Sequence, residues 1–258
     1  LRITQQVRRY LDSKKIPNRL YAGHCLPGGD VNTEPICQEI VDDLEREVIS
    51  GMIVISSNPR AYWTKYVNDQ KLPVVGGMGL GPVVDLGYSD AIEKGLKYLV
   101  DHGRKRIATF GCPGYNRIPE ILERLGIEAN PQWLCDHITP HMEKTAVDEF
   151  TKIFTASGER PNGLLVGDDI VFKFLSTAIL ELKIQVPDEL MIVAHANKGV
   201  DYRLPFPVMR METDPDAYAL KLGELMEKLL NGEEVAEHET VELDWIEARG
   251  TPLARNDQ

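Results

Sequence analysis

Apolar residues recur along the chain in two alternating patterns. Short, wholly apolar runs such as 52–55 (MIVI) and 164–166 (LLV) predict strands buried on both faces of a sheet. Between such runs, apolar residues recur every three or four positions, as in the helix expected over about 169–183. The alternation runs to a last expected strand at 240–248 (TVELDWIEA). It predicts an α/β protein with parallel sheets flanked by helices, because right-handed crossovers place helices on the sheet faces.

The number of strand–helix units is too large for one compact doubly wound sheet, so we expect two sheets. The sequence contains no internal repeat, low-complexity tract or long linker, and any hinge must consist of short crossovers. Ligands of open parallel sheets bind beyond the carboxyl ends of the strands. The expected segments at those ends are rich in Gly, Asn, Asp, His and Arg; they are 56–58, 76–79, 111–117, 138–141, 167–169 and 195–198.

Composition excludes several classes of protein. The 258 residues are 43% hydrophobic and 27% charged, which favours a folded core over disorder. The formal net charge of −11 argues against direct binding of nucleic acid phosphates. No stretch is long and apolar enough to cross a membrane, and no signal peptide is evident. The four cysteines form no CxxC or zinc pattern, so we expect buried thiols, a reducing cytoplasmic location, no metal and no cofactor.

Two adjacent carboxylates, Asp168 and Asp169, follow the apolar run 164–166 and precede an expected helix. They could form a catalytic pair, a metal site, a ligand clamp or a helix cap. Adjacent residues at a strand–helix junction point in different directions, which disfavours an acid–base pair. No Ser-His, Cys-His or phosphate-loop motif supports catalysis, so we do not expect an enzyme. We predict that Asp169 is the helix N-cap, whereas Asp168 is either a ligand contact or a second helix-terminus charge.

Three segments resemble the effector-binding domain of the lactose and galactose repressors (LacI/GalR family). They are 98–111 (YLVDHGRKRIATFG), 163–197 (from GLLVGDD to MIVAHAN), and 222–251 (LGELMEKLLNGEE followed by VELDWIEARGT). The resemblance covers nearly the whole chain. It implies the fold of type I periplasmic sugar-binding proteins, with two lobes joined by three crossovers. The expected lobes are 1–103 with 212–232, and 104–211 with 233–258.

The resemblance also implies a function. The chain would be the effector-sensing and dimerising part of a bacterial transcription regulator, and a small, carbohydrate-related molecule would bind in an interlobe cleft. Binding would shift an open–closed equilibrium and so control DNA binding. The homodimer would contact operator DNA through a helix-turn-helix that residues 1–258 lack, as they lack the first strand of the domain. The alternative is an exported type I solute-binding protein, which would carry an export signal.

The family motifs place several residues at the expected cleft. Arg117 matches the arginine of the family's Arg-x-x-Gly-Phe motif, and a guanidinium suits a carboxylate or vicinal hydroxyls. Its glycine partner is Glu120 here, so an Arg117–Glu120 pair on a helix surface is the alternative. Asp168 matches an Asn that faces the cleft in the family. His141 falls near the position of an aromatic residue that covers the ligand in relatives; the alternative is that His141 is a loop histidine without a role.

Departures from the family motifs bear on the ligand. The family's Gly-Phe-Asp-Asp becomes 194–197, with His195 and Asn197 expected to line the cleft and Ala196 in place of an acid. The Asp-Asn before the second long helix becomes Gly87-Tyr88, which makes Tyr88 a candidate contact. The usual acceptors for sugar hydroxyls are therefore partly lost. We expect a polyol, sugar acid or modified sugar rather than plain glucose or galactose.

Overall fold

The computed structural model describes residues 2–22, 37–55, 63–76, 81–112, 116–200 and 204–248. The chain folds into two compact units, each made of two chain segments. Unit 1 contains Leu1–Leu86 and Pro215–Val241, and unit 2 contains Gly87–Asp214 and Glu242–Gln258. The chain therefore passes between the units three times. Within the described ranges, no helix has the length and apolar character needed to cross a bilayer.

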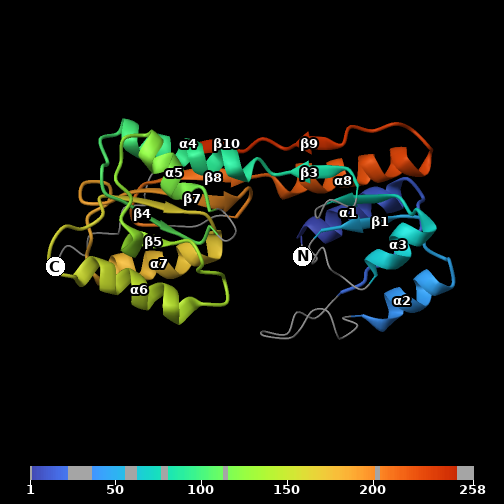
Figure 1. Ribbon diagram of the computed structural model, residues 1–258, viewed down its shortest axis with the longest axis horizontal. Helices are drawn as coiled ribbons and strands as arrows, with labels where there is room; N and C mark the ends of the chain where they lie inside the picture. The colour runs from blue at the N-terminus through green and yellow to red at the C-terminus, as the bar shows by residue number, and fades with distance from the viewer. Residues whose placement is uncertain are drawn as a thin grey trace, which may run out of the picture. The chain divides into compact units, whose positions relative to one another are not determined.

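Unit 2 is built on a six-stranded sheet with the order β10-β8-β7-β6-β4-β5 (Figure 1). All neighbouring strands run parallel except β10, which is antiparallel to β8. Strands β4 and β6 are fully buried because helices cover both of their faces. The strands are β4 (Ile107–Phe110), β5 (Leu134–Cys135), β6 (Gly163–Val166), β7 (Met191–Asn197), β8 (Val208–Thr213) and β10 (Asp244–Ala248).

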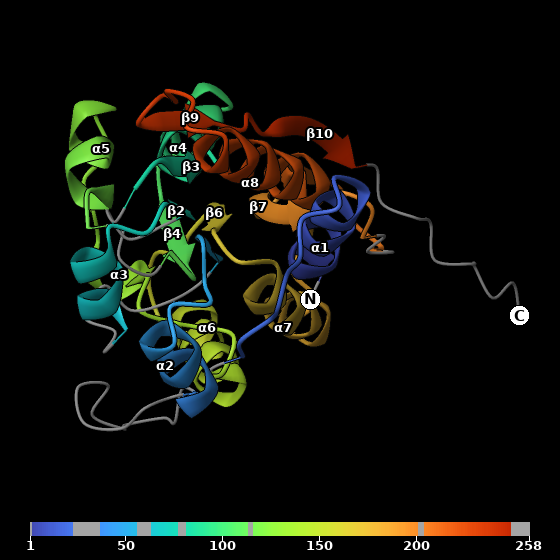
Figure 2. The same cartoon turned by 90° about the vertical axis from the view of Figure 1, so that its right-hand side faces the viewer.

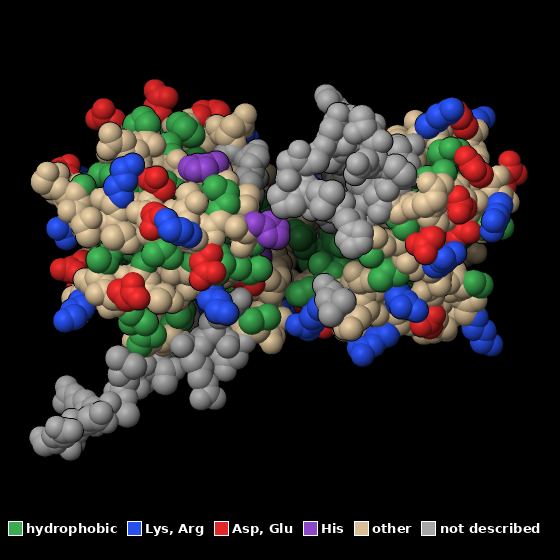
Figure 3. Space-filling model, turned by 90° about the horizontal axis from the view of Figure 1, so that it is seen from below, with side chains coloured by type: hydrophobic (Ala, Val, Ile, Leu, Met, Phe, Trp, Pro, Cys, Tyr) green, Lys and Arg blue, Asp and Glu red, His purple; other side chains and the backbone are tan. Residues whose placement is uncertain are grey.

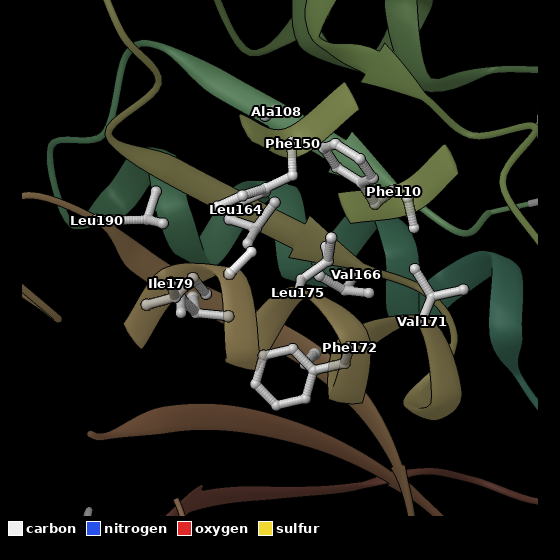
Figure 4. Close-up of a cluster of buried hydrophobic side chains, with 14 of the residues drawn as sticks. Ala108, Phe110, Phe150, Leu164, Val166, Val171, Phe172, Leu175, Ile179 and Leu190 are labelled. Atoms are coloured by element: carbon white, nitrogen blue, oxygen red, sulfur yellow. The ribbon is translucent and has the colours of Figure 1, made fainter. Parts of the chain in front are cut away.

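Two pairs of helices enclose this sheet (Figure 1). On one face, α4 (Tyr88–Asp101) and α5 (Ile118–Arg124) bury apolar side chains against Leu165 and Val193. On the other face, α6 (Glu143–Thr155) and α7 (Asp169–Glu181) form the second core. Figure 4 shows this second core. Its labelled residues are Ala108, Phe110, Phe150, Leu164, Val166, Val171, Phe172, Leu175, Ile179 and Leu190.

Unit 1 is a smaller α/β assembly. Helix α1 (Arg2–Ser13) packs along α8 (Pro215–Leu230), as Figure 2 shows. Two parallel strand pairs lie in this unit, β1 with β2 and β3 with β9. Its two cores form around α1 and α8 and around α2 and α3. The remaining elements are α2 (Gln38–Glu45), β1 (Met52–Val54), α3 (Thr64–Gln70), β2 (Val74–Gly76), β3 (Val83–Asp85) and β9 (His238–Thr240).

The structure corrects several details of the sequence prediction. Helix α4 belongs to unit 2 because its apolar face packs on β6 and β7, so the first division falls after Leu86 rather than near Gly103. The expected strand 240–248 is observed as β10 (Asp244–Ala248), which pairs in unit 2. Its first residue, Thr240, instead ends β9, a separate strand that begins at His238 and pairs in unit 1, so the last division falls after Val241. Strand β3 was not predicted at all. Segments 56–58 and 77–79 lie outside the described residues.

Candidate functional site

The carboxyl ends of β7 and β8 carry a chain of hydrogen-bonded polar side chains. Thr213 Oγ1 lies 3.1 Å from His195 Nε2 and 3.1 Å from Asn197 Oδ1. Asn197 Nδ2 in turn donates to Asp169 Oδ2 at 2.9 Å. Because the threonine hydroxyl has one proton to give to Asn197, His195 is assigned as the Nε2–H tautomer that donates to Thr213. Four side chains from two strands and helix α7 are thus held in one arrangement.

His195 is held in its neutral form by this environment. Burial lowers the pKa of its imidazole, and the charges of Asp169 and Asp168 only partly oppose that effect. With Nε2 donating to Thr213, Nδ1 is left as an acceptor. Nδ1 is buried and has no hydrogen-bond partner among the described residues. A buried acceptor without a hydrogen-bond partner is uncommon in folded proteins, which makes His195 a candidate functional residue.

Tyr88, the first residue of α4, packs against this group. Its hydroxyl donates to the carbonyl oxygen of Gly167 at 2.8 Å, and its ring meets that of His195 edge-on at 6.3 Å between centroids. Burial raises the pKa of the phenol, so it remains a protonated donor. Gly167 is required here, since an added Cβ would lie 2.0 Å from the Tyr88 hydroxyl oxygen and 2.7 Å from the Gly111 carbonyl oxygen.

The structure adds Asp136, which the sequence analysis missed, to this end of the sheet. Asp136 directly follows β5, and burial raises the pKa of its carboxyl group, an effect that Thr109 and Cys112 partly oppose. Neither Asp136 Oδ1 nor Thr109 Oγ1 reaches hydrogen-bonding geometry with a described residue, although both atoms are buried. The sequence analysis expected this strand to end at 138–141, so the earlier end of β5 at Cys135 was not foreseen; Thr213, which ends β8, was also missed.

The two adjacent carboxylates have roles opposite to the predicted ones. Asp168, not Asp169, is the N-cap of α7, because its Oδ1 accepts from the backbone N–H groups of Ile170 at 2.9 Å and Val171 at 3.0 Å. Asp169 lies within the helix and holds Asn197. The second oxygen of Asp168, Oδ2, makes no hydrogen bond to a described residue. It is therefore available as an acceptor at the sheet edge.

Arg117 and His141 are not joined to this group by any hydrogen bond among the described residues. Arg117 precedes α5 and forms an ion pair with Glu120, with 3.5 Å between Nε and Oε2, while its side chain is 52% exposed. This is the alternative considered for Arg117 from the sequence. His141 is exposed in the turn before α6. The structure thus brings together Tyr88, Asp168, His195 and Asn197, and does not include Arg117 and His141 in the same network.

The chemistry of this group suits binding better than catalysis. Burial raises the pKa of the Cys112 thiol strongly, which keeps it protonated and unreactive. Asp168 and Asp169 are engaged as a cap and as the partner of Asn197, so neither faces the other as an acid–base pair. In the part of the chain that the structure describes, no group of three or more His, Cys, Asp or Glu side chains could hold a metal ion. What remains is a set of fixed acceptors and donors at a strand end.

Sequence comparison places the chain among known domains. Residues 96–251 match the family described as periplasmic binding protein-like domain. Over 140 residues the chain is 26% identical to the uncharacterized HTH-type transcriptional regulator YkvZ of Bacillus subtilis (strain 168). That alignment covers 51% of this chain and 43% of the relative, so the chain matches less than half of the relative's length.

Solved structures share the fold over nearly the whole chain. The transcription regulator CcpA of Lactococcus lactis matches with a TM-score of 0.74 and 18% identity, covering 98% of this chain and 93% of that one. The transcriptional regulator CelR, solved as a cellobiose complex, matches with a TM-score of 0.76 and 14% identity, covering 96% of this chain and 78% of that one. At these identities the likeness establishes the fold.

Proposed function

Because the chain belongs to the periplasmic binding protein-like domain family, we propose that it is the effector-binding domain of a bacterial LacI-type transcription regulator. The predicted α/β fold and the predicted resemblance to LacI/GalR effector-binding domains are confirmed by the family match and the regulators that share the fold. The effector, the binding residues and the link to DNA are our proposal. In this proposal a small polyhydroxylated molecule binds at the carboxyl end of the unit 2 sheet.

One observation supports this location above others. Tyr88, His195, Thr213 and Asn197 form a rigid polar group where four parallel strands end, and open α/β sheets bind their ligands at that edge. The network fixes each side chain before a ligand arrives, which reduces the entropic cost of binding. Asp168 Oδ2 adds a charged acceptor at the same edge.

The available groups favour a neutral ligand rich in hydroxyls. Asp168 Oδ2 is an acceptor at the sheet edge, and a hydroxyl is a donor that suits it. Arg117, which would favour a sugar acid, is paired with Glu120 instead. The structural relative solved with cellobiose supports a carbohydrate. We therefore place a sugar or polyol ahead of the sugar acid that the sequence also allowed.

Titration calorimetry with a panel of cellobiose, a hexose, a polyol and gluconate tests the proposal. We expect at least one neutral compound to bind, and Asn197→Ala to weaken that binding by about tenfold, since a lost hydrogen bond is worth about 1.4 kcal/mol. Asn231→Ala, in unit 1, is the matched control and should bind as the wild type does. Equal affinity in Asn197→Ala would remove this residue from the site.

The regulatory part of the proposal concerns assembly. Two copies would pair so that two DNA-binding heads, contributed by a segment outside residues 1–258, meet a palindromic operator. Sedimentation velocity at micromolar concentration should show a dimer of this chain, and a monomer would contradict the proposal. The coding sequence upstream of residue 1 distinguishes the alternatives, because a helix-turn-helix supports a cytoplasmic regulator and an export signal supports a solute-binding protein.

A further inference from the structure

A cavity lies at the amino-terminal edge of the unit 2 sheet, opposite the candidate functional site. Arg106 directly precedes β4 and Asn162 directly precedes β6, and both line this cavity of about 330 Å³. It is distinct from the carboxyl-end site because parallel strands separate the two edges. Its lining residues are Arg104, Arg106, Phe154, Arg160, Pro161, Asn162, Ile184, Asp188 and Glu189.

Three arginines converge on this cavity without a carboxylate partner among the described residues. Arg104 donates to the carbonyl oxygens of Pro187 at 3.0 Å and Asp188 at 3.2 Å, and Arg106 Nε donates to the carbonyl oxygen of Arg160 at 2.6 Å. The chain has 40 acidic and 29 Lys and Arg residues, so acids are plentiful. Figure 3 shows acidic and basic side chains interspersed on the face that it displays. Three guanidinium groups therefore line one cavity without an ion pair to a carboxylate of the described residues.

Several donors at the cavity remain unused. Arg104 Nε is buried and has no hydrogen-bond partner among the described residues. The terminal nitrogens of Arg106 make no hydrogen bond in the described part of the chain, and neither does the Arg160 guanidinium. Asn162 Oδ1 accepts from the backbone N–H of Arg106 at 3.0 Å. This bond fixes the side-chain amide of Asn162, whose NH₂ group is a further donor. The unused arginine donors that a ligand in the cavity could reach are therefore the terminal nitrogens of Arg106 and the Arg160 guanidinium.

The two acids that line the cavity do not neutralise it. Glu189 Oε2 accepts from the backbone N–H of Gln185 at 2.9 Å and so closes the turn before β7. Asp188 contributes its carbonyl oxygen to Arg104. Among the described residues, neither carboxylate forms an ion pair with an arginine that lines the cavity. With three arginines and two carboxylates, the lining of the cavity carries a formal net charge of +1.

We propose that this cavity binds a small organic phosphate. Arginine forks bind oxyanions with two parallel hydrogen bonds. A phosphate offers three or four oxygens and can meet several guanidinium groups at once, whereas a carboxylate offers two. Phe154 and Ile184 form an apolar wall on which the carbon part of the ligand packs. The volume is that of a site for a small molecule. The ligand would bind independently of the carboxyl-end site.

Calorimetry with pyrophosphate as the probe, at low ionic strength, tests the site. The Arg160→Ala variant is the most informative because the Arg160 guanidinium makes no hydrogen bond among the described residues, so its loss leaves the fold intact. We expect pyrophosphate binding to the wild type, and at least a tenfold loss of affinity in Arg160→Ala and in Arg106→Lys, which keeps the charge but loses the fork. Lys105→Ala, an exposed neighbour that does not line the cavity, is the control and should bind as the wild type does.

Three outcomes would overturn the proposal. The first is no pyrophosphate binding to the wild type. The second is equal loss of affinity in Lys105→Ala and Arg160→Ala, which would mean that binding follows net charge alone. The third is tighter binding of citrate than of pyrophosphate, which would assign the cavity to carboxylates. Unchanged melting temperatures of the variants would show that a loss of binding is not a loss of folding.

Discussion

Asp168 shows how one residue serves both the fold and the proposed site. Its Oδ1 caps helix α7 through two backbone N–H groups, and its Oδ2 faces no described donor. The sequence predicted one cap among two adjacent acids but chose Asp169. The choice could not be made from residue type, because both acids favour a helix start and helix boundaries shift by one residue between local conformations. Only the extended backbone of Asp168 distinguishes the cap.

Removing the cap should destabilise the chain measurably. We expect Asp168→Ala to lower the free energy of unfolding by about 1 kcal/mol, because two backbone N–H groups of α7 lose their acceptor. Asp168→Asn keeps a side-chain oxygen in place and should retain most of that stability. Urea unfolding followed by circular dichroism measures both variants. A loss in Asp168→Asn as large as that in Asp168→Ala would mean that the charge, not the cap, is what matters.

His195 should make the stability of the chain depend on pH. Its pKa is lowered in the folded state, so the unfolded chain takes up the proton first as the pH falls. The contribution of neutral His195 is therefore complete above about pH 6.5 and is lost as the pH falls from there towards the folded pKa, by at most about 1.4 kcal/mol per pH unit. Replacing His195 with Gln should flatten this part of the stability profile.

The comparison is made by denaturant unfolding of wild type and His195→Gln at intervals from pH 7.5 to 5.5. The two proteins share every other ionisable group, so the difference between the two profiles isolates His195. The contribution of Asp136 to stability changes with pH in the opposite direction. Its raised pKa makes the folded state hold a proton to higher pH than the unfolded state does, so this contribution grows as the pH falls. Parallel profiles for the two proteins would contradict the assignment of a buried, neutral imidazole.

At the scale of the elements, α4 depends on a glycine to lie close to the sheet. A Cβ at Gly95 would come within 2.6 Å of Leu165 Cδ1 and 3.2 Å of Val193 Cγ1, so the helix backbone approaches β6 and β7 directly. This packing places Tyr88, the first residue of α4, beside His195. The close approach explains why α4 belongs to unit 2, which the helical pattern of the sequence alone did not reveal.

We therefore expect Gly95→Ala to destabilise the chain, although alanine is the better helix former by up to about 1 kcal/mol. Overpacking a buried contact costs about 1–3 kcal/mol, which exceeds the gain in helix propensity. Thermal unfolding measures the effect. A Gly95→Ala variant that is more stable than the wild type would show that α4 stands farther from the sheet than the structure indicates.

The elements that the sequence predicted best are those with the strongest pattern. Strands β1 and β6 and helix α7 have continuous or periodic apolar positions, and they were expected near their observed bounds, at 52–55, 164–166 and about 169–183. Strand β3 was missed because three residues, Val83–Asp85, carry too little pattern to be distinguished from a loop. The strand expected at 240–248 begins only at Asp244, after β9 has ended at Thr240, because β9 pairs with β3 and β10 pairs with β8; the sequence alone does not contain those tertiary contacts.

For the whole molecule, three passages of the chain between two units match the organisation expected from the family. The boundaries differ from prediction by 17 residues at the first passage (after 86 rather than 103) because α4 joins unit 2. The candidate site could be predicted in part, since Tyr88, Asp168, His195 and Asn197 stand at strand or helix ends. Asp136 and Thr213 could not be ranked above other polar loop residues without the contacts that connect them to the sheet edge.

The central claim is that a sugar or polyol binds at the carboxyl end of the unit 2 sheet. Hydrogen–deuterium exchange with and without the tightest-binding compound of the calorimetric panel tests it most directly. We predict added protection in the segments 167–171 and 195–198, where the proposed ligand would order the backbone next to Asp168 and Asn197. Unchanged exchange rates in these two segments, or a panel in which no compound binds, would contradict the claim.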